Sequence, residues 1–351
     1  MKIATILDTF PSTSETFIAR EIEALRRRGF LIEVFAFNAG EGATPIPQSL
    51  AQKLSPRRWE AVGHALNLSG FDHVHAGWAN HLADVAGAAA KRANIPWSFS
   101  AHARDLWVEG GDLKLKLASA KFASSCTLAG VEELKRFGSN VVYAPHGLEL
   151  KDFPFQEWHP PTDEAKLIGV GRLVEKKGWS DLFEIVWDEW AHNWHFPFVL
   201  ELVGDGPDRA ALEKAAKNSA VSSFIRFRGA LPHEDVARAM RNAHCLVLPS
   251  RRTKDGDRDG LANVLLEAAA LGLPVVTTNA GSASDFVDET IGLLVEAGDS
   301  MALQKAIWRV FDEPEKTIER CLNARRRVEE RFDADKNIEV LAELFTNEPR
   351  A

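Results

Sequence analysis

Three positively charged side chains stand close together in the segment GVGRLVEKKG. Arg172, Lys176 and Lys177 end or follow the run 167–173, which is typical of a buried strand. Cations at the carboxyl end of a strand can hold a diphosphate, because guanidinium and ammonium groups donate charge-assisted hydrogen bonds to phosphate oxygens. An exposed basic loop is the alternative, and this segment alone does not separate the two interpretations.

Two acidic residues in DRDGLANVLLEAAALGLPVV, Asp259 and Glu267, could bind the other groups of a ligand that contains a diphosphate. The run 261–271 predicts a buried helix that ends at Gly272, and Glu267 lies in its middle. A carboxylate there costs free energy unless it is paired or used, and it could accept hydrogen bonds from a ribose diol. Asp259 could contact the opposite end of an elongated ligand, ~12 Å away along a straight helix. The alternatives are a paired core carboxylate for Glu267 and a capping acid for Asp259.

The backbone before this helix predicts an anion site. The free N–H groups at a helix start attract negative charge together with the helix dipole, and here they belong to Gly260, Leu261, Ala262 and Asn263. In LVGDGP, Gly204 lets the backbone approach a ligand closely, although any tight strand-to-helix turn can contain such a glycine.

A pair of aspartates in DGDRDG has the residue types that bind a divalent cation. Asp255 and Asp257 could hold such an ion on a diphosphate. Arg172, Lys177 and the helix N-terminus already supply the countercharge. We therefore expect no essential metal and no other cofactor.

Strands that alternate with helices must position these residues. Apolar runs typical of strands lie at 2–8, 31–37, 73–78, 97–102, 122–129, 140–147, 167–173, 198–204, 224–229, 245–250, 274–278 and 292–296. The alternation predicts parallel sheets covered by helices on both faces. The fold class is therefore α/β, with two doubly wound Rossmann-like domains that bind ligands in a cleft between them, outside the carboxyl ends of the strands.

A Pro-rich, aperiodic segment at 153–165 divides the chain. We predict an N-terminal domain at 1–152, this segment as the linker, and a C-terminal domain at 166–330. The final segment, 333–351, contains an amphipathic pattern and predicts a helix that packs back on the N-terminal domain.

Two further local patterns indicate structure. Ser12 and Glu15 predict a capping box at the start of the first helix. Trp187, Trp190 and Trp194 fall on one face of a predicted helix, and packing is the role expected of such a stripe.

Composition limits the class of protein. The 351 residues are 45% hydrophobic and 26% charged, as in soluble globular proteins. There is no run of 18 or more apolar residues, and MKIATILDTF predicts a first strand and not a signal peptide. Cys126, Cys245 and Cys321 are widely spaced, which suits a reducing cytosol and shows no metal or disulfide pattern. We expect a cytoplasmic protein.

The net charge of −8 is unevenly distributed. Residues 1–150 hold 16 Lys and Arg against 15 Asp and Glu, and the remainder holds 26 against 35. Basic clusters at 26–28, 53–58 and 114–116 could meet anionic lipid. For any single cluster, a solvated helix face is the preferred interpretation.

An ordered set of segments resembles the GT4 family of retaining glycosyltransferases, which have the GT-B fold. GVGRLVEKKG, LVGDGP, FRGALPHEDV, CLVLPS and DGLANVLLEAAALGLPVVTTNAG cover most of 167–300 in the family's order. FPSTSETFIAREIEAL and SAHARDLW resemble a subgroup linked to exopolysaccharide assembly, such as the colanic-acid-type transferases. The resemblance implies two facing Rossmann-like domains that bind a nucleotide sugar.

The resemblance also implies roles for single residues. The family's Glu-x7-Glu motif reads Asp259-x7-Glu267 here. The second acid would bind the ribose, and the first would approach the donor sugar with a reach shortened by one methylene. Arg172 and Lys177 would bind the leaving diphosphate. His102 in SAHARD would lie beside the reacting sugar, although an isolated histidine at a strand end is more often a satisfied core residue.

Four more residues complete the predicted donor site. The base would rest near Ala230 and Leu231, largely on backbone groups. The first helix, at 14–29, would direct its N-terminus at the diphosphate, which gives Ser14 and Thr16 a donor-binding role.

We therefore expect a retaining, metal-independent transferase that uses a nucleotide-diphosphate sugar, with UDP-sugars preferred and GDP-mannose next. The acceptor would be a glycan or an undecaprenyl-diphosphate-linked glycan in cell-surface or exopolysaccharide synthesis. The protein would associate peripherally with the inner face of the plasma membrane, and no nucleic acid is expected. Two alternatives stay open: an epimerase of sugar nucleotides on the same fold, and a catalytically weak partner subunit, which only the shortened Asp259 supports.

Overall fold

The computed structural model describes residues 1–12, 15–47, 58–185, 197–219 and 222–346. Ser14 and the tryptophans 187, 190 and 194 lie outside the described residues, as does most of the basic cluster at 53–58. The chain divides into two compact units. The first comprises Met1–Leu148 and Phe332–Ala351, and the second comprises Glu149–Arg331.

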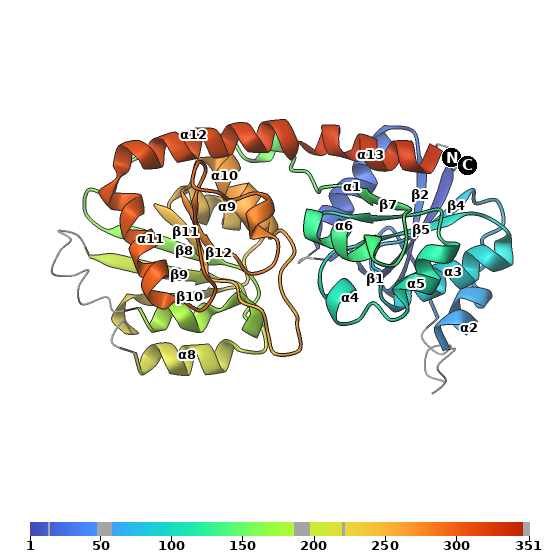
Figure 1. The fold of residues 1–351 in the computed structure, drawn as a ribbon, viewed down its shortest axis with the longest axis horizontal. Helices are drawn as coiled ribbons and strands as arrows, with labels where there is room; N and C mark the ends of the chain where they lie inside the picture. The colour runs from blue at the N-terminus through green and yellow to red at the C-terminus, as the bar shows by residue number, and fades with distance from the viewer. Residues whose placement is uncertain (13–14, 48–57, 186–196, 220–221, 347–351) are drawn as a thin grey trace. The chain divides into compact units, whose positions relative to one another are not determined.

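The first unit contains a parallel sheet with strand order β3-β2-β1-β4-β5-β6-β7. Figure 1 labels β1, β2, β4, β5 and β7 of this sheet. Its strands are β1 (Lys2–Phe10), β2 (Leu31–Ala39), β3 (Ala43–Pro45), β4 (His73–Ala76), β5 (Trp97–Ala101), β6 (Phe122–Ser125) and β7 (Val141–Tyr143). The sequence predicts all of these except β3, which is a short edge strand without an apolar run. The strand order reverses between β1 and β4, and doubly wound sheets bind ligands at such a switch point.

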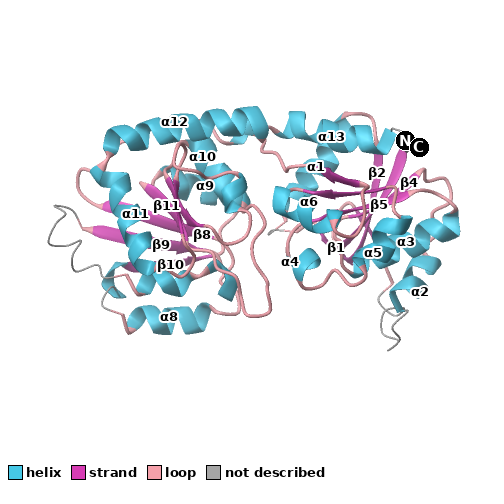
Figure 2. Ribbon diagram, viewed as in Figure 1, coloured by secondary structure: helices cyan, strands magenta, loops and turns pink. Residues whose placement is uncertain are grey.

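Helices cover both faces of this sheet (Figure 2). They are α1 (Thr16–Arg27), α2 (Arg58–Ala65), α3 (His81–Ala93), α4 (Arg104–Trp107), α5 (Leu113–Ser119), α6 (Leu128–Lys135) and α13 (Ala334–Thr346). One hydrophobic cluster joins α1, α13 and the sheet, and a second joins α2, α3, α5 and the sheet. The final helix thus belongs to the first unit, where Ile338, Leu341 and Phe345 are buried.

The start of α1 differs from the sequence prediction. The helix begins at Thr16 with Glu15 as its N-cap, and no side chain caps it. Ser12 and Glu15 therefore do not form the predicted capping box, because the helix starts too late for Ser12 to occupy the N-cap position.

Two predicted basic clusters are neutralised within the first unit. Arg28 lies 2.6 Å from Glu339 and Arg27 lies 3.2 Å from Asp335, both on α13. The ammonium group of Lys116 is buried and donates to three backbone carbonyls. Arg27, Arg28 and Lys116 are therefore held within this unit and are not a free cationic surface.

The second unit contains a parallel sheet with strand order β10-β9-β8-β11-β12-β13. Its strands are β8 (Ala165–Val170), β9 (Phe198–Val203), β10 (Ile225–Gly229), β11 (Cys245–Leu248), β12 (Val275–Thr278) and β13 (Leu293–Val295). Its α-helices within the described residues are α8 (Arg209–Lys217), α9 (His233–Arg241), α10 (Asn263–Leu271), α11 (Ser300–Asp312) and α12 (Pro314–Arg331). The switch point of this sheet lies between β8 and β11. This is the Rossmann order, so the predicted α/β class with two doubly wound units is confirmed.

The boundary between the units lies at Leu148 and Glu149, not within a free linker at 153–165. Phe153 is 1% exposed and Trp158 is 5% exposed. The indole of Trp158 donates to the carbonyl of His244 in the second unit. The segment 153–165 shows no periodic sequence pattern because it forms almost no regular secondary structure. Its aromatic side chains nevertheless pack within the second unit. Within the described residues, no helix is long and apolar enough to cross a membrane.

Candidate functional site

The loops at the switch point of the second unit bring together cations and acids that are far apart in the sequence. Lys176 and Lys177 end a 3-10 turn, η3 (Glu175–Lys177), shortly after β8. Gly178 follows with φ +65°, and a Cβ atom there would lie 1.9 Å from the carbonyl oxygen of Pro249, after β11. Only glycine allows this approach, which places the two loops side by side.

Asp259 is the centre of this cluster. Its carboxylate accepts a hydrogen bond from Lys177 at 2.8 Å and another from the hydroxyl of Ser250 at 2.8 Å. Lys176 lies 3.9 Å from Asp259 and 3.1 Å from Asp257. Burial by itself raises the pKa of Asp259, but the charges of Lys177 and Lys176 outweigh burial and hold the pKa below its usual value. The carboxyl group of Asp259 is therefore ionised at neutral pH.

The two aspartates of DGDRDG have partners within the protein. Asp257 pairs with Lys176, and Asp255 accepts hydrogen bonds from Thr253 and from the backbone N–H of Asp257. The sequence prediction assigns Lys177 to a diphosphate and Asp259 to a sugar. In the structure the two side chains contact each other, so a diphosphate would have to share Lys177 with Asp259. Arg172 is exposed, at the carboxyl end of β8.

The helix α10 begins at Asn263, two residues later than the sequence predicts. Its N-cap is Ala262, whose side chain cannot accept a hydrogen bond, and no side chain caps this helix. The free N–H groups of the first turn therefore begin at Asn263, while Gly260 and Leu261 lie in the preceding loop. An uncapped helix start favours an anion.

Glu267 is buried on α10, 7% exposed. The ring Nε2 of His233, the first residue of α9, lies 3.6 Å from its carboxylate. Ala230 and Leu231 form the loop between β10 and α9, at the carboxyl end of β10, and Leu231 lines a cavity of about 490 Å³. Sequence reasoning missed His233, which lies within the FRGALPHEDV segment.

Gly204 makes a close backbone approach within the second unit. Its φ is +141°, and a Cβ atom there would lie 1.9 Å from the carbonyl oxygen of Gly171. The close approach that requires glycine is thus to the loop after β8. Gly204 shapes the loop that carries Arg172, and no ligand is needed to explain it.

Two predicted site residues lie in the first unit. Thr16 is the first residue of α1 and is half-buried. His102 directly follows β5 and is 8% exposed. Its Nε2 is 2.9 Å from the carbonyl oxygen of Gly77, and its Nδ1 is 3.3 Å from Nε2 of His146. Both ring nitrogens thus have partners inside the first unit.

His102 belongs to a buried cluster that sequence reasoning missed. The Sγ atom of Cys126 lies 3.7 Å from Nδ1 of His102, and Glu21 on α1 lies 2.6 Å from Nδ1 of His146. Burial by itself raises the pKa of the Cys126 thiol, but His146 and His102 outweigh burial and lower it to about 6. Burial by itself lowers the pKa of His146, but Cys126 and Glu21 outweigh burial and raise it to about 10. The available signal was a cysteine and two histidines in the later parts of three successive predicted strand segments, 97–102, 122–129 and 140–147.

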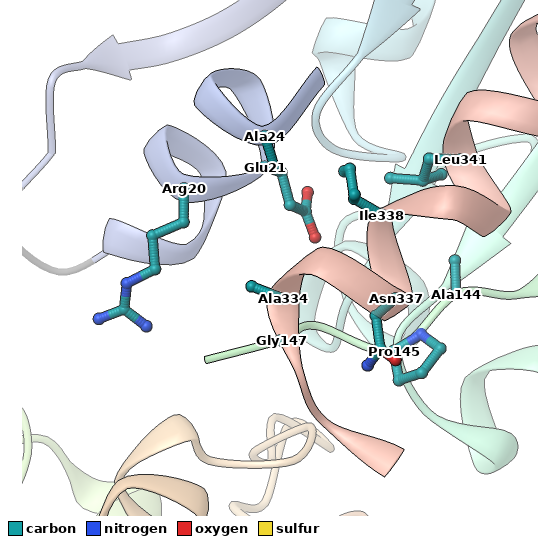
Figure 3. A pocket seen from close by; sticks show the side chains of 10 residues that line it. All are labelled: Arg20, Glu21, Ala24, Ala144, Pro145, Gly147, Ala334, Asn337, Ile338 and Leu341. Carbon is teal, nitrogen blue, oxygen red and sulfur yellow. The ribbon is translucent and has the colours of Figure 1, made fainter. Parts of the chain in front are cut away.

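Figure 3 shows the surroundings of Glu21. Its carboxylate lies between α1 and α13, beside a small pocket that Ala334, Ile338 and Pro145 also line. Asn337 on α13 donates to the backbone carbonyl of His146 at 3.2 Å. The final helix therefore helps to hold the loop that carries this histidine.

Sequence comparison relates the chain to sugar transferases. The pattern of the family described as glycosyl transferases group 1 matches residues 151–328, just over half of the chain. The amylovoran biosynthesis glycosyltransferase AmsK of Erwinia amylovora is 28% identical over 200 residues, which are 57% of this chain and 49% of that protein. The putative teichuronic acid biosynthesis glycosyltransferase TuaC of Bacillus subtilis is 28% identical over 289 residues, 77% of this chain and 69% of that protein. The chain thus spans about half the length of the first of these relatives.

Solved structures show the same fold. The sucrose-phosphate synthase of Thermosynechococcus elongatus is 21% identical with a TM-score of 0.79, and 98% of each chain is covered. Anabaena HepE, solved in complex with UDP-glucose, is 18% identical with a TM-score of 0.78 and the same coverage. The sequence-based expectation of a GT-B fold related to exopolysaccharide-type enzymes is confirmed, and the chain belongs to the glycosyl transferases group 1 family.

Proposed function

We propose that this protein transfers a sugar from a nucleoside-diphosphate sugar to a glycan or lipid-linked acceptor, with retention of configuration and without a metal ion at the diphosphate. The observation that carries the proposal is the cluster of Lys177, Asp259 and Ser250 at the switch point of the second unit. A fixed ammonium group and an uncapped helix start at Asn263 suit a ligand that is anionic at one end. The carboxylate of Asp259 and the hydroxyl of Ser250 suit a ligand that carries several hydroxyl groups at its other end.

The difficult step in such a reaction is the departure of the diphosphate. Negative charge grows on the leaving group as the sugar becomes an oxocarbenium-like cation. Arg172 and Lys177 would stabilise that charge, helped by the first-turn N–H groups of α10. We propose attack on the same face of the sugar, with a phosphate oxygen taking the proton of the acceptor hydroxyl. Asp259 would position the sugar, and Glu267 would accept hydrogen bonds from the ribose.

The nucleotides to test are those that the descriptions of similar proteins name. HepE binds UDP-glucose, which supports UDP as the first nucleotide to test. A mannosyltransferase among the relatives is described as GDP-mannose-dependent, which supports GDP as the second. The acceptor is proposed by analogy with the polysaccharide-synthesising relatives. Peripheral membrane binding draws no support from Arg27 and Arg28, because both pair with acids of α13.

The proposal is tested by thermal unfolding with UDP, GDP and ADP, followed by transfer assays with the matching sugars. A ligand that binds only the folded state raises stability by about 2.7 kcal/mol at a hundred times its dissociation constant. Arg172→Ala and Lys177→Ala should each lower the shift and the turnover. Lys305→Ala removes an exposed charge of α11 in the same unit and should change neither. Intact turnover in both site variants would refute the assignment, and no shift with any nucleotide would favour a catalytically weak partner subunit.

A further inference from the structure

Three side chains with metal-binding atoms converge at the carboxyl edge of the sheet in the first unit. His102 directly follows β5, Cys126 directly follows β6, and His146 lies three residues after β7. These strands are neighbours in the sheet, so their carboxyl ends meet at one edge. One ligand atom from each residue lies within 4.8 Å of the other two. The three side chains are between 6% and 9% exposed.

The outer hydrogen bonds orient both histidines toward the cluster. The carbonyl oxygen of Gly77 can only accept, so Nε2 of His102 donates to it at 2.9 Å. The carboxylate of Glu21 accepts from Nδ1 of His146 at 2.6 Å. When each imidazole is neutral, its remaining nitrogen carries a lone pair that faces the cluster. A ligating histidine almost always donates its other N–H to a carboxylate or a carbonyl in this way.

Two of the three distances between the ligand atoms fit the edges of one coordination tetrahedron, and the third is at most 4.8 Å. Zinc bonds of about 2.0–2.1 Å to nitrogen and about 2.3 Å to sulfur place two nitrogens about 3.3 Å apart, and a nitrogen and a sulfur about 3.6 Å apart. The nitrogens of His102 and His146 are 3.3 Å apart, and Cys126 Sγ is 3.7 Å from Nδ1 of His102. No side chain would have to move far to bind one ion.

The charges of the cluster also match a divalent cation. With His146 neutral, as metal binding requires, a thiolate at Cys126 and the carboxylate of Glu21 would carry two negative charges in a buried region, which a divalent cation would compensate. A cavity of about 30 Å³ adjoins the cluster, lined in part by Glu21, His75, Ser100 and His102. That volume holds roughly one or two water molecules, one of which could complete the coordination.

We propose that His102, Cys126 and His146 form a site for a zinc-type divalent transition metal ion in the first unit, with Glu21 as the orienting partner of His146. The ion ties together the loops after β5, β6 and β7. Its ligands include His102, whose remaining ring nitrogen then binds the ion. All three ligands belong to the first unit. The diphosphate chemistry proposed for the second unit still needs no metal, and the inference does not depend on the proposed function.

The first experiment is a titration of the chelator-treated full chain, without an added histidine tag, with Co²⁺ and then Zn²⁺. Binding should saturate at one Co²⁺ per chain and produce the charge-transfer absorption of a thiolate–cobalt bond, which Zn²⁺ then displaces. Zinc should raise the melting temperature. The proposal would be overturned if Co²⁺ bound without a thiolate–cobalt absorption band, or if the folded protein bound no Co²⁺. The three side chains would then share a proton in place of a metal ion.

Variants locate the site on this cluster. Cys126→Ser should abolish the thiolate band, and Cys245→Ser, a buried cysteine of the second unit, should retain it. Glu21→Gln should weaken metal affinity about 10–100-fold while the band persists, because the change affects only the orienting partner. If Cys126→Ser fails to fold, His146→Gln serves in its place and should weaken binding at least as much as Glu21→Gln. A thiolate band unchanged in Cys126→Ser, or unchanged affinity in both Glu21→Gln and His146→Gln, would overturn the assignment.

Discussion

Lys177 donates a hydrogen bond to the carboxylate of Asp259 over 2.8 Å, and only 12% of each side chain is exposed. The cation expected to bind the diphosphate is therefore held by the acid expected to contact the sugar. The pair positions Lys177 before any ligand binds. It also makes Asp259 a competitor of the diphosphate, which gives the first prediction.

Asp259→Asn should separate nucleotide binding from transfer. Removal of the negative charge frees Lys177 for the diphosphate, so the affinity for the nucleoside diphosphate should rise several-fold while turnover falls. The free energy of unfolding without ligand should drop by about 3 kcal/mol, because Lys177 loses a buried partner. Calorimetric titration and denaturant unfolding measure both effects. Weaker nucleotide binding in this variant would contradict the competition.

The stability of the protein should depend on the ionisation of Asp259 in acid. The pKa of this carboxyl is lower in the folded protein than its ordinary value of 3.8. Its contribution is thus fully present well above pH 3.8 and is lost as the pH falls toward the folded value. The difference in unfolding free energy between the wild type and Asp259→Asn should therefore shrink between about pH 5 and pH 2. A constant difference across that range would show that the charge of Asp259 does not stabilise the fold.

Glu267→Gln should weaken nucleotide binding through the ribose. Hydrogen bonds to a charged group contribute about 1.5–3 kcal/mol, so the affinity should fall about tenfold or more. The wild type should also prefer UDP over 2′-deoxy-UDP, and the variant should lose most of that preference. His233→Gln is the matched control, because it removes the neighbour of Glu267 at 3.6 Å and leaves the carboxylate in place. Equal preference for the two nucleotides in the wild type would remove the ribose contact from the proposal.

The final helix should be a major source of stability for the first unit. Phe345 is 2% exposed and its ring contacts Phe30 and Phe122. Phe345→Ala should lower the free energy of unfolding by about 3–5 kcal/mol, because it leaves a cavity under α13. Glu343→Ala, at an exposed position of the same helix, should change it by less than about 0.5 kcal/mol. Denaturant unfolding of the two variants measures the contrast.

The strands could be predicted from the sequence because parallel strands buried on both faces read as continuous apolar runs. The run at 198–204 became β9, and the run at 245–250 became β11. Ala43–Pro45 gave no such signal, because an edge strand of three residues buries little apolar surface. The helix starts were less accurate: α1 and α10 each begin two residues later than predicted, since end positions depend on local hydrogen bonds that composition does not reveal.

By itself the sequence determined the two Rossmann-like units and the loops that carry the candidate residues, because both follow from local periodicity and from the order of strands. Only the tertiary structure decided which of those residues meet. Lys177 and Asp259 are 82 positions apart, and His102 and His146 are 44 apart. Each pair is formed by the lateral pairing of strands in a sheet, which brings distant carboxyl ends to one edge. The spacing of residues within a single segment does not show such contacts, so the sequence did not predict that Lys177 pairs with Asp259 or that His102 lies in a cluster with Cys126 and His146.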